Sequence, residues 1–158
     1  MHYWLLKSEP DVFSIDDLKD SPKRTQSWDG VRNYQARNMI RDQMRPGDQA
    51  FFYHSSCAEP GIAGIMEIAS EAYPDATAFQ RGHAQFDAKS DAASPRWFAV
   101  DVRFVRKLKR MLTLNELRDE AGLRDMVLLR RGNRLSVMPV TVKQWRHVLA
   151  LETRGTRA

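Results

Sequence analysis

The sequence predicts an α+β domain built on a curved or closed β-sheet with short flanking helices. Segments with strand character are interspersed with short helical segments, without the regular strand–helix alternation of a doubly wound fold. At 158 residues the chain has the length of one ordinary domain and can bury a core without disulfides or metal. We therefore expect residues 1–158 to form a single domain.

Five segments carry the apolar or alternating pattern of β-strands. The pattern is clearest in 97–105, where the even-numbered positions are apolar and the odd-numbered positions include Asp101 and Arg103. Two glycines in 61–69 predict a bulge or a close approach of two backbones. The expected strands are Tyr3–Lys7, Asp48–Ser55, Gly61–Ala69, Trp97–Val105 and Leu135–Val140.

Three helix starts share one capping pattern, in which a Ser or Thr and an acid or amide three residues later bond each other's backbone. The pairs are Ser14 with Asp17, Thr113 with Glu116, and Thr141 with Gln144. The last pair opens a C-terminal helix from Val142 to about Leu151. Gly122 is expected to stop the helix that begins after Thr113.

The charge balance favours a polyanionic partner without proving one, because 25 Lys and Arg residues outnumber 20 Asp and Glu residues. The single cysteine, Cys57, excludes an internal disulfide and a cysteine-cluster zinc site, and it indicates a reducing compartment. No apolar run is long enough to span a membrane, and the N-terminus lacks a signal-peptide pattern. We therefore expect a soluble, cytoplasmic protein without a membrane partner.

The segment WDGVRNYQARN, Trp28–Asn38, has the features of a pocket mouth. An Asp-Gly pair favours a turn, and Asn33 is a good N-cap for a helix. Arginines recur at every fourth position from Arg37 to Arg45, so a helix would carry them on one stripe near its N-terminus, where an anion is favoured. In the alternative interpretation the tryptophan belongs to the core and the arginines to a solvated face.

No motif for catalysis or cofactor binding emerges from the sequence. The four histidines lack metal-ligand spacing and the glycines fit no phosphate-binding loop, so we expect no metal, no cofactor and no catalytic residue. His54 and Cys57 superficially form an imidazole–thiol pair, but their spacing has no special meaning. Asp101 lies mid-strand among apolar neighbours, where a bridge to Arg103 and a ligand role are equally open.

The segment Tyr73–Arg96 differs from the rest, because it is rich in Ala, Asp, Ser and Pro around isolated Phe79 and Phe86. Long connections of this kind are functional loops or disordered segments. The two aromatics could close over a ligand, although packing the loop down is the commoner use.

Aromatic, amide, hydroxyl and basic side chains without a catalytic motif fit a flat, hydrogen-bonding ligand attached to phosphate. A nucleobase can stack on an aromatic ring while amides and hydroxyls read its edge. A base that enters a pocket singly must leave its stack, and a modification that fills otherwise empty space then adds selectivity.

Long sequence blocks resemble the signature blocks of the EVE domain family nearly from end to end. The blocks are YWLLKSEP (Tyr3–Pro10), WDGVRNYQARN (Trp28–Asn38), GDQAFFYHSSCAEPGIAG (Gly47–Gly64), RWFAVDVRF (Arg96–Phe104) and LLRRGNRLSVMPVTVKQW (Leu128–Trp145). The resemblance implies a PUA-like β-barrel with flanking helices, similar to the YTH domain. It also implies recognition of modified bases, namely modified cytosines such as 5-methylcytosine in DNA for EVE domains and N6-methyladenine in RNA for YTH domains.

The same resemblance implies a base-binding pocket. Lys7 and Ser8 correspond to the pair that ends the first strand beside the base, and Trp28 corresponds to an aromatic wall. The other expected pocket residues are Asn33, Tyr34, His54, Ser55 and Asp101. One departure concerns the long loop: residues 85–89 read Gln-Phe-Asp-Ala-Lys, where relatives tend to carry Tyr-Tyr-Asp-Pro-Lys. This change bears on the order of the loop and on which modification fits.

The leading interpretation is a non-catalytic reader that holds a modified base, foremost a modified cytosine in DNA and otherwise a modified base in RNA. Arg32, Arg37 and Arg41 are expected to hold the phosphates of the nucleic acid, and the chain is expected to be a monomer, with an effector protein as an open further partner. Two alternatives remain. One is an enzyme acting on a modified nucleotide or small anion, with Asp101 or His54 as acid or base; the other is an interaction module gated by a metabolite.

Overall fold

The structure, a computed structural model, describes residues 1–154. The strands are β1 (Tyr3–Ser8), β2 (Thr25–Trp28), β3 (Gln49–His54), β4 (Gly61–Ile68), β5 (Tyr73–Pro74), β6 (Phe98–Thr113) and β7 (Val137–Val140). The helices are α1 (Ile15–Asp20), α2 (Tyr34–Asn38), α3 (Leu114–Arg118) and α4 (Val142–Arg154). A π-helical turn, Met39–Gln43, continues α2, and short 3₁₀ turns occupy Pro22–Arg24, Ala76–Phe79, Ala121–Leu123 and Val127–Leu129.

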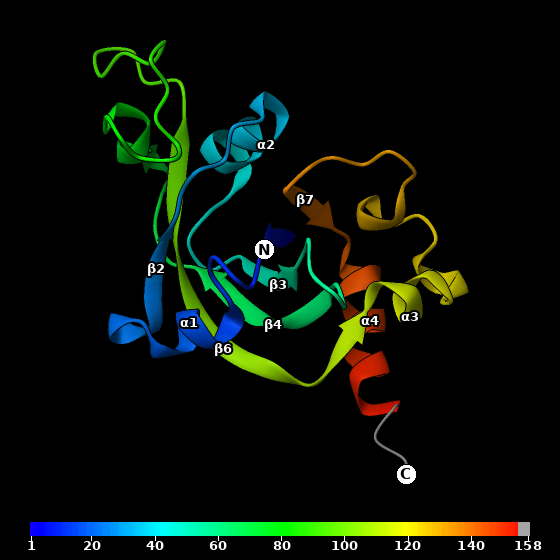
Figure 1. Cartoon of the computed structure of the whole chain (residues 1–158). Coiled ribbons are helices and arrows are strands. Elements are labelled where there is room, and N and C mark those ends of the chain that lie inside the picture. The colour runs from blue at the N-terminus through cyan, green and yellow to red at the C-terminus, as the bar shows by residue number, and fades with distance from the viewer. Residues whose placement is uncertain (155–158) are drawn as a thin grey trace.

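Within residues 1–154 the strands form one mixed sheet in the order β2-β6-β4-β3-β1-β7, with β5 added beside β6 (Figure 1). β1 and β3 run parallel, and the other strand pairs are antiparallel. The sheet curves but does not close, since its outer strands β2 and β7 pair only inward. The α+β class and the curved sheet are thus confirmed, and of the two expected forms, curved or closed, the sheet takes the open one.

β6 connects much of the sheet, because its 16 residues pair with β2, β4 and β5. In Figure 1 it crosses the whole molecule, from the green loop beside α2 to α3 and α4 at the opposite end. Its register against β4 shifts between Ile62 and Gly64, where β6 bulges. A Cβ atom on Gly61 would lie 2.4 Å from the Leu112 carbonyl oxygen, so the predicted close approach of two backbones is confirmed.

Side chains on the two faces of the sheet form two cores. Neighbouring residues of β1 illustrate the division, because Trp4 and Leu6 enter one core while Leu5 enters the other. The first core contains Trp28 together with residues of α1 and α2. The second core is covered by α4, whose Trp145 ring stacks on Phe51 with ring centroids 3.9 Å apart.

The capping pattern locates the helix starts well. Ser14 with Asp17 and Thr141 with Gln144 form complete capping boxes, in which each side chain accepts the backbone amide of the other residue. At the start of α3 the Thr113 hydroxyl accepts the Glu116 amide. Gly122 does not stop α3, which ends earlier at Arg118. It lies instead in a 3₁₀ turn where a Cβ atom would meet the His147 ring at 2.5 Å.

Two strands were not expected from the sequence. β2 is short and mostly polar, and β5 has two residues, so neither carries a periodic signal; both exist because they pair with β6. Of the helices in residues 1–154, none is both long and apolar enough to cross a membrane.

Candidate functional site

A cavity of about 390 Å³ opens beside Trp28 at the end of β2. Three segments meet there: the end of β1 with the loop after it, β2 with the turn after it, and the tip of the 73–96 segment. The lining residues are Lys7, Ser8, Val12, Phe13, Gln26, Ser27, Trp28, Asp29, Gly30, His83, Ala84 and Gln85. Lys7, Ser8 and Trp28, three residues singled out from the sequence, therefore share one cavity.

Trp28 belongs both to the core and to the cavity wall. Its ring packs edge-on against Phe52 at a centroid distance of 5.3 Å and against Phe13 at 6.5 Å, and the residue is 7% exposed. Burial on one side and a cavity on the other fix the plane of the indole. The two interpretations of Trp28 from the sequence, core residue and pocket wall, therefore do not exclude each other.

Lys7 adds a positively charged residue to the lining of this cavity. Its ammonium lies 5.8 Å from the centroid of the Tyr53 ring and forms no ion pair within the described chain. Burial lowers the pKa of Lys7 below its usual value. An acceptor atom or an anion in the cavity would therefore gain a strong hydrogen-bond donor.

Ser8 shapes the wall rather than offering a free hydroxyl. Its hydroxyl donates to the Phe13 carbonyl at 2.6 Å, and its own carbonyl accepts the amide N–H of Ser55 at 3.0 Å. Both bonds hold the chain that follows β1 against the cavity. Ser55 thus supports the site through its backbone and is not itself a lining residue.

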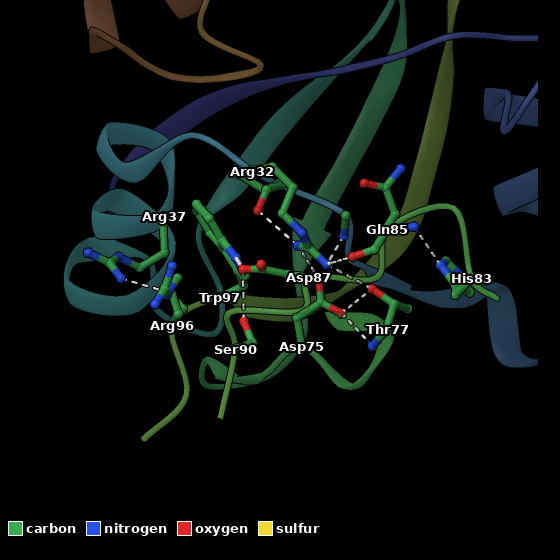
Figure 2. Close-up of polar contacts among 12 residues, drawn as sticks. Arg32, Arg37, Asp75, Thr77, His83, Gln85, Asp87, Ser90, Arg96 and Trp97 are labelled. Atoms are coloured by element: carbon green, nitrogen blue, oxygen red, sulfur yellow. Dashed lines mark hydrogen bonds and ion pairs between the residues drawn. The ribbon is translucent and has the colours of Figure 1, made fainter. Parts of the chain in front are cut away.

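Arg32 holds the 73–96 segment in place (Figure 2). One terminal nitrogen donates to Asp75 at 3.0 Å, and the other donates to the Thr77 hydroxyl at 3.2 Å and the Gln85 carbonyl at 2.7 Å. Its guanidinium also lies 5.4 Å from the centroid of the Trp97 ring. Both terminal nitrogens donate inside the chain, so Arg32 acts as an internal clamp, and its expected phosphate role stays a prediction.

Asp75 is the acceptor at the centre of this clamp. Its side chain is fully buried and also accepts the Gly30 amide at 2.8 Å and the Thr77 amide at 2.9 Å. Burial by itself would raise the pKa of Asp75, but hydrogen bonds from Thr77, Gly30 and Arg32 outweigh it and lower that pKa. The clamp therefore ties the turn after Trp28 to the loop that forms the opposite cavity wall.

The rest of the 73–96 segment is anchored as well. Asp87 accepts the Trp97 indole N–H at 2.7 Å (Figure 2). It also accepts the Lys89 amide at 3.0 Å. Arg37 donates to the Arg96 carbonyl at 2.6 Å. The Asp retained in the altered Gln-Phe-Asp-Ala-Lys run thus orders the loop. Phe86 lines a neighbouring hollow of about 340 Å³ and not the cavity beside Trp28.

Besides Ser55, four residues expected in the pocket lie outside the cavity lining. Asn33 caps α2 by accepting the Ala36 amide at 3.0 Å, and the Tyr34 ring stacks on Trp97 with centroids 4.8 Å apart. His54 accepts the Ile15 amide at 3.2 Å. Asn33, Tyr34 and His54 each do structural work that their position in a sequence block does not reveal.

Asp101, the fourth of these residues, is satisfied beneath the cavity. It accepts a 2.6 Å hydrogen bond from the Tyr73 hydroxyl, which also lies 2.7 Å from the hydroxyl of the lining residue Ser27. Burial and the bond to Asp101 raise the pKa of Tyr73 to about 12. Arg103 pairs with Glu67 and not with Asp101, so the alternative of a bridge to Arg103 is wrong, and the ligand role of Asp101 stays a prediction.

The arginine stripe is only partly realised. The π-helical turn interrupts the α-helical spacing after Asn38, so Arg37 and Arg41 follow different helical geometries. Arg41 forms an exposed pair with Asp42 at 2.7 Å, and Arg45 bonds carbonyls of its own turn. Arg37 and Arg41 keep solvent-facing donors near α2, and their phosphate role stays a prediction.

Asp29, Gln26, His83 and Gln85 are cavity residues that the sequence analysis did not select. Asp29 counted only as a turn former, and Gln85 only as a departure from the family pattern. Burial and the nearby Asp75 raise the pKa of Asp29, while His83 and Arg32 act in the opposite direction. The turn signal next to Trp28 was the one sequence feature that pointed to Asp29.

Comparison with known proteins extends these findings. Residues 2–151 match the model of the EVE domain. Human thymocyte nuclear protein 1 is 47% identical to this chain over 169 residues, which cover 96% of this chain and 74% of the human protein. An uncharacterized protein from Schizosaccharomyces pombe is 40% identical over 92% of this chain and 66% of its own length.

Solved structures agree with the fold. The crystal structure of human THYN1 protein in complex with 5-methylcytosine-containing DNA has a TM-score of 0.92 and 48% identity, covering 96% of this chain and 98% of that one. A crystal structure of a protein from Pseudomonas syringae has a TM-score of 0.91 and 51% identity, covering 95% and 99%. A match over residues 2–151 and 47% identity to thymocyte nuclear protein 1 show that the chain belongs to the EVE domain family.

Proposed function

We propose that this protein binds DNA without catalysis and holds one modified base, foremost 5-methylcytosine, in the cavity beside Trp28. The observation that carries the proposal is this cavity, lined by Trp28 and Lys7, in a chain 48% identical to the human protein solved with 5-methylcytosine-containing DNA. A modified base in RNA is the second candidate, because the same walls would accept an unstacked base from either nucleic acid.

The energetics favour a modified base over a plain one. Taking a base out of its stack costs a few kcal/mol, and stacking on an aromatic side chain returns about 1–3 kcal/mol. A buried methyl group adds about 0.8 kcal/mol, which corresponds to a roughly four-fold preference. The fixed plane of Trp28 strengthens the stacking, because little side-chain entropy is lost when the base enters.

Cationic side chains around the cavity would hold the phosphate backbone of the nucleic acid. Lys7 lines the cavity, and Arg37 and Arg41 lie on the helix that follows the Trp28 turn. Exposed arginines Arg130, Arg131 and Arg134 precede Ser136, whose carbonyl accepts the Lys7 amide at 2.8 Å. Binding should therefore weaken as salt rises, with a log–log slope that grows with the number of phosphates held.

Two observations favour binding over catalysis. Asp101 and His54, the acid or base candidates, do not line the cavity, and each is hydrogen-bonded inside the chain. Among residues 1–154, no group of three or more His, Cys, Asp or Glu could hold a metal ion. A monomeric state, an effector partner and a cytoplasmic location stay predictions; the human relative carries the word nuclear in its name.

A paired substitution tests the proposal. Trp28→Leu removes the stacking face but keeps an apolar side chain, and it should weaken binding to a 5-methylcytosine oligonucleotide about 5- to 150-fold. Trp145→Leu is the matched control, because Trp145 is equally buried but lies in the other core. Fluorescence anisotropy gives the affinities, and thermal unfolding shows whether both variants fold.

Two results would overturn the proposal. If both tryptophan variants bind with the same affinity as each other, the indole of Trp28 does not contact the base. If the wild-type protein binds methylated and plain oligonucleotides equally, the cavity does not recognise the modification. A metabolite-gated interaction module predicts both results.

A further inference from the structure

Some polar side chains that line the cavity are hydrogen-bonded to other residues of the chain, and others are not. The Ser8 hydroxyl donates to the Phe13 carbonyl, and the Ser27 hydroxyl bonds Tyr73. The side chains of Lys7, Gln26, Asp29 and Gln85 have no hydrogen bond to another residue within the described chain. Among the described lining residues Asp29 is the one carboxylic acid, so it is the natural acceptor for a ligand N–H group.

The backbone sets the position of Asp29 relative to the indole. Trp28 pairs with Val100 of β6, which fixes the residue before Asp29. Gly30, the residue after it, has φ of +80° and donates its amide to the buried Asp75. The backbone of Asp29 is therefore held next to Trp28, and its side chain belongs to the wall of the cavity that a base would enter.

Cytosine and thymine differ at the edge that such a carboxylate would meet. Cytosine carries an amino donor at C4 and an acceptor at N3, whereas thymine carries an oxygen acceptor at C4. A carboxylate accepts from the amino group of cytosine and repels the oxygen of thymine. The difference matters here, because 5-methylcytosine and thymine carry the same methyl group and the cavity cannot tell them apart by shape alone.

We propose that Asp29 is the specificity-determining residue that reads the 4-amino group of a cytosine-type base stacked on Trp28. This inference rests on the proposed function and adds the base identity to it. Gln26 and Gln85 offer both donors and acceptors and so would not exclude thymine. Lys7, a donor, would serve the carbonyl oxygen at C2 or a phosphate, which both bases possess.

The electrostatic surroundings of Asp29 agree with this role. Burial and Asp75 disfavour the ionised carboxylate and raise its pKa, with His83 and Arg32 as the opposing groups and Lys7 on the β1 wall of the cavity. A ligand amino group that donates to the carboxylate would relieve this penalty. The amide of Asn has nearly the same shape but offers a donor as well as an acceptor, so Asn at this position should lose most of the discrimination against thymine.

The test uses three single-stranded oligonucleotides of one sequence, which carry 5-methylcytosine, cytosine or thymine at one central position. The ratio of thymine to 5-methylcytosine dissociation constants measures edge reading, and the ratio of cytosine to 5-methylcytosine constants measures methyl recognition. For the wild-type chain we expect about 5- to 150-fold for the first ratio and about four-fold for the second. Comparing ratios of dissociation constants removes any general gain in DNA affinity that a variant acquires when it loses a negative charge.

Variants then isolate the carboxylate. Asp29→Ala should bring the thymine ratio close to one and leave the methyl ratio unchanged. Asp29→Asn should also bring the thymine ratio close to one, because its amide can donate to the thymine oxygen. Asp125→Ala, which removes an exposed carboxylate outside the cavity, should change neither ratio. Circular dichroism melting confirms that each variant is folded.

The possible failures are distinguishable. If Asp29→Ala keeps the wild-type ratio of thymine to 5-methylcytosine dissociation constants, the role of Asp29 is overturned while the proposed function stands. A wild-type chain that discriminates thymine through Asp29 but ignores the methyl group supports the role of Asp29 and refutes methyl recognition. Equal binding of all three oligonucleotides by the wild-type chain overturns both proposals.

Discussion

Replacing Asp75 by Asn tests the clamp that builds one wall of the cavity. The carboxylate is fully buried and accepts hydrogen bonds from Arg32, Gly30 and Thr77. Asn keeps the shape of the side chain but removes the charge, so Arg32 would be left without its counter-ion. The substitution therefore isolates the electrostatic part of the clamp from its packing.

The expected loss follows from the geometry. Removing one partner of a buried ion pair costs about 3–5 kcal/mol, since the remaining charge stays desolvated. The Arg32 side chain retains 21% exposure, so water can relieve part of this cost and we expect a value near 3 kcal/mol. For a chain of 158 residues this corresponds to a fall in the melting temperature of roughly 6–12 °C.

Guanidinium unfolding followed by circular dichroism gives the free energy of unfolding for wild type, Asp75→Asn, Arg32→Met and the double variant. If the two residues act as one unit, the double variant loses less than the sum of the single losses, by about 0.5–3 kcal/mol. Glu67→Gln is the matched control, because Glu67 and Arg103 form a 2.6 Å hydrogen bond at the surface, with 51% of the Arg103 side chain exposed. Such a pair contributes about 0–1 kcal/mol. A loss for Asp75→Asn no larger than that of Glu67→Gln would refute the clamp.

Three further predictions concern the stability of the fold. Because hydrogen bonds hold the pKa of Asp75 below its unfolded value near 3.9, its stabilising effect is complete above that value and is lost as the pH falls through the lower folded pKa. Proteolysis within 80–96 should therefore accelerate at acid pH, with an acid-active protease, more in wild type than in Asp75→Asn; an equal acceleration would contradict the linkage. Gly61→Ala should lower the free energy of unfolding by about 1–3 kcal/mol or more, because the new methyl group would lie 2.4 Å from a backbone oxygen that cannot rotate away; a melting temperature equal to wild type would show that the strands can separate there. Glu152→Gln should cost about 1–3 kcal/mol, because this 2% exposed carboxylate receives bonds from Arg106 and from the Lys109 amide; thermal unfolding measures the loss, and a value near zero would mean that water replaces these bonds.

The elements predicted with the best agreement are those whose signal is local. β1, β3, β4 and α4 lie within a residue or so of their expected N-terminal boundaries, because an apolar run or a capping pair is contained in the segment itself. β2 and β5 have no such signal, since their hydrogen-bond partner β6 lies far along the chain. The full length of β6 was also missed, because its second half is strongly basic and alternates poorly.

The candidate site divides in the same way. The sequence by itself determined the α+β class and the helix after Trp28, and the family resemblance implied that Lys7, Ser8 and Trp28 share one site. The helix start could be predicted because its capping residue and apolar positions lie within a few residues of each other, which is the range over which backbone and side-chain preferences act.

Only the tertiary structure decided which polar groups remain free for a ligand. In the sequence Arg32 is indistinguishable from Arg37 or Arg41, but the fold brings it to Asp75, a residue 43 positions away, and makes it part of a clamp. Asp29 is the opposite case. Its sequence neighbours predict only a turn, but in the fold it lines the same cavity as Trp28. The physical reason is that a hydrogen-bonding group is used up by whatever partner the fold supplies, and that partner lies at a distance along the chain that no local pattern encodes.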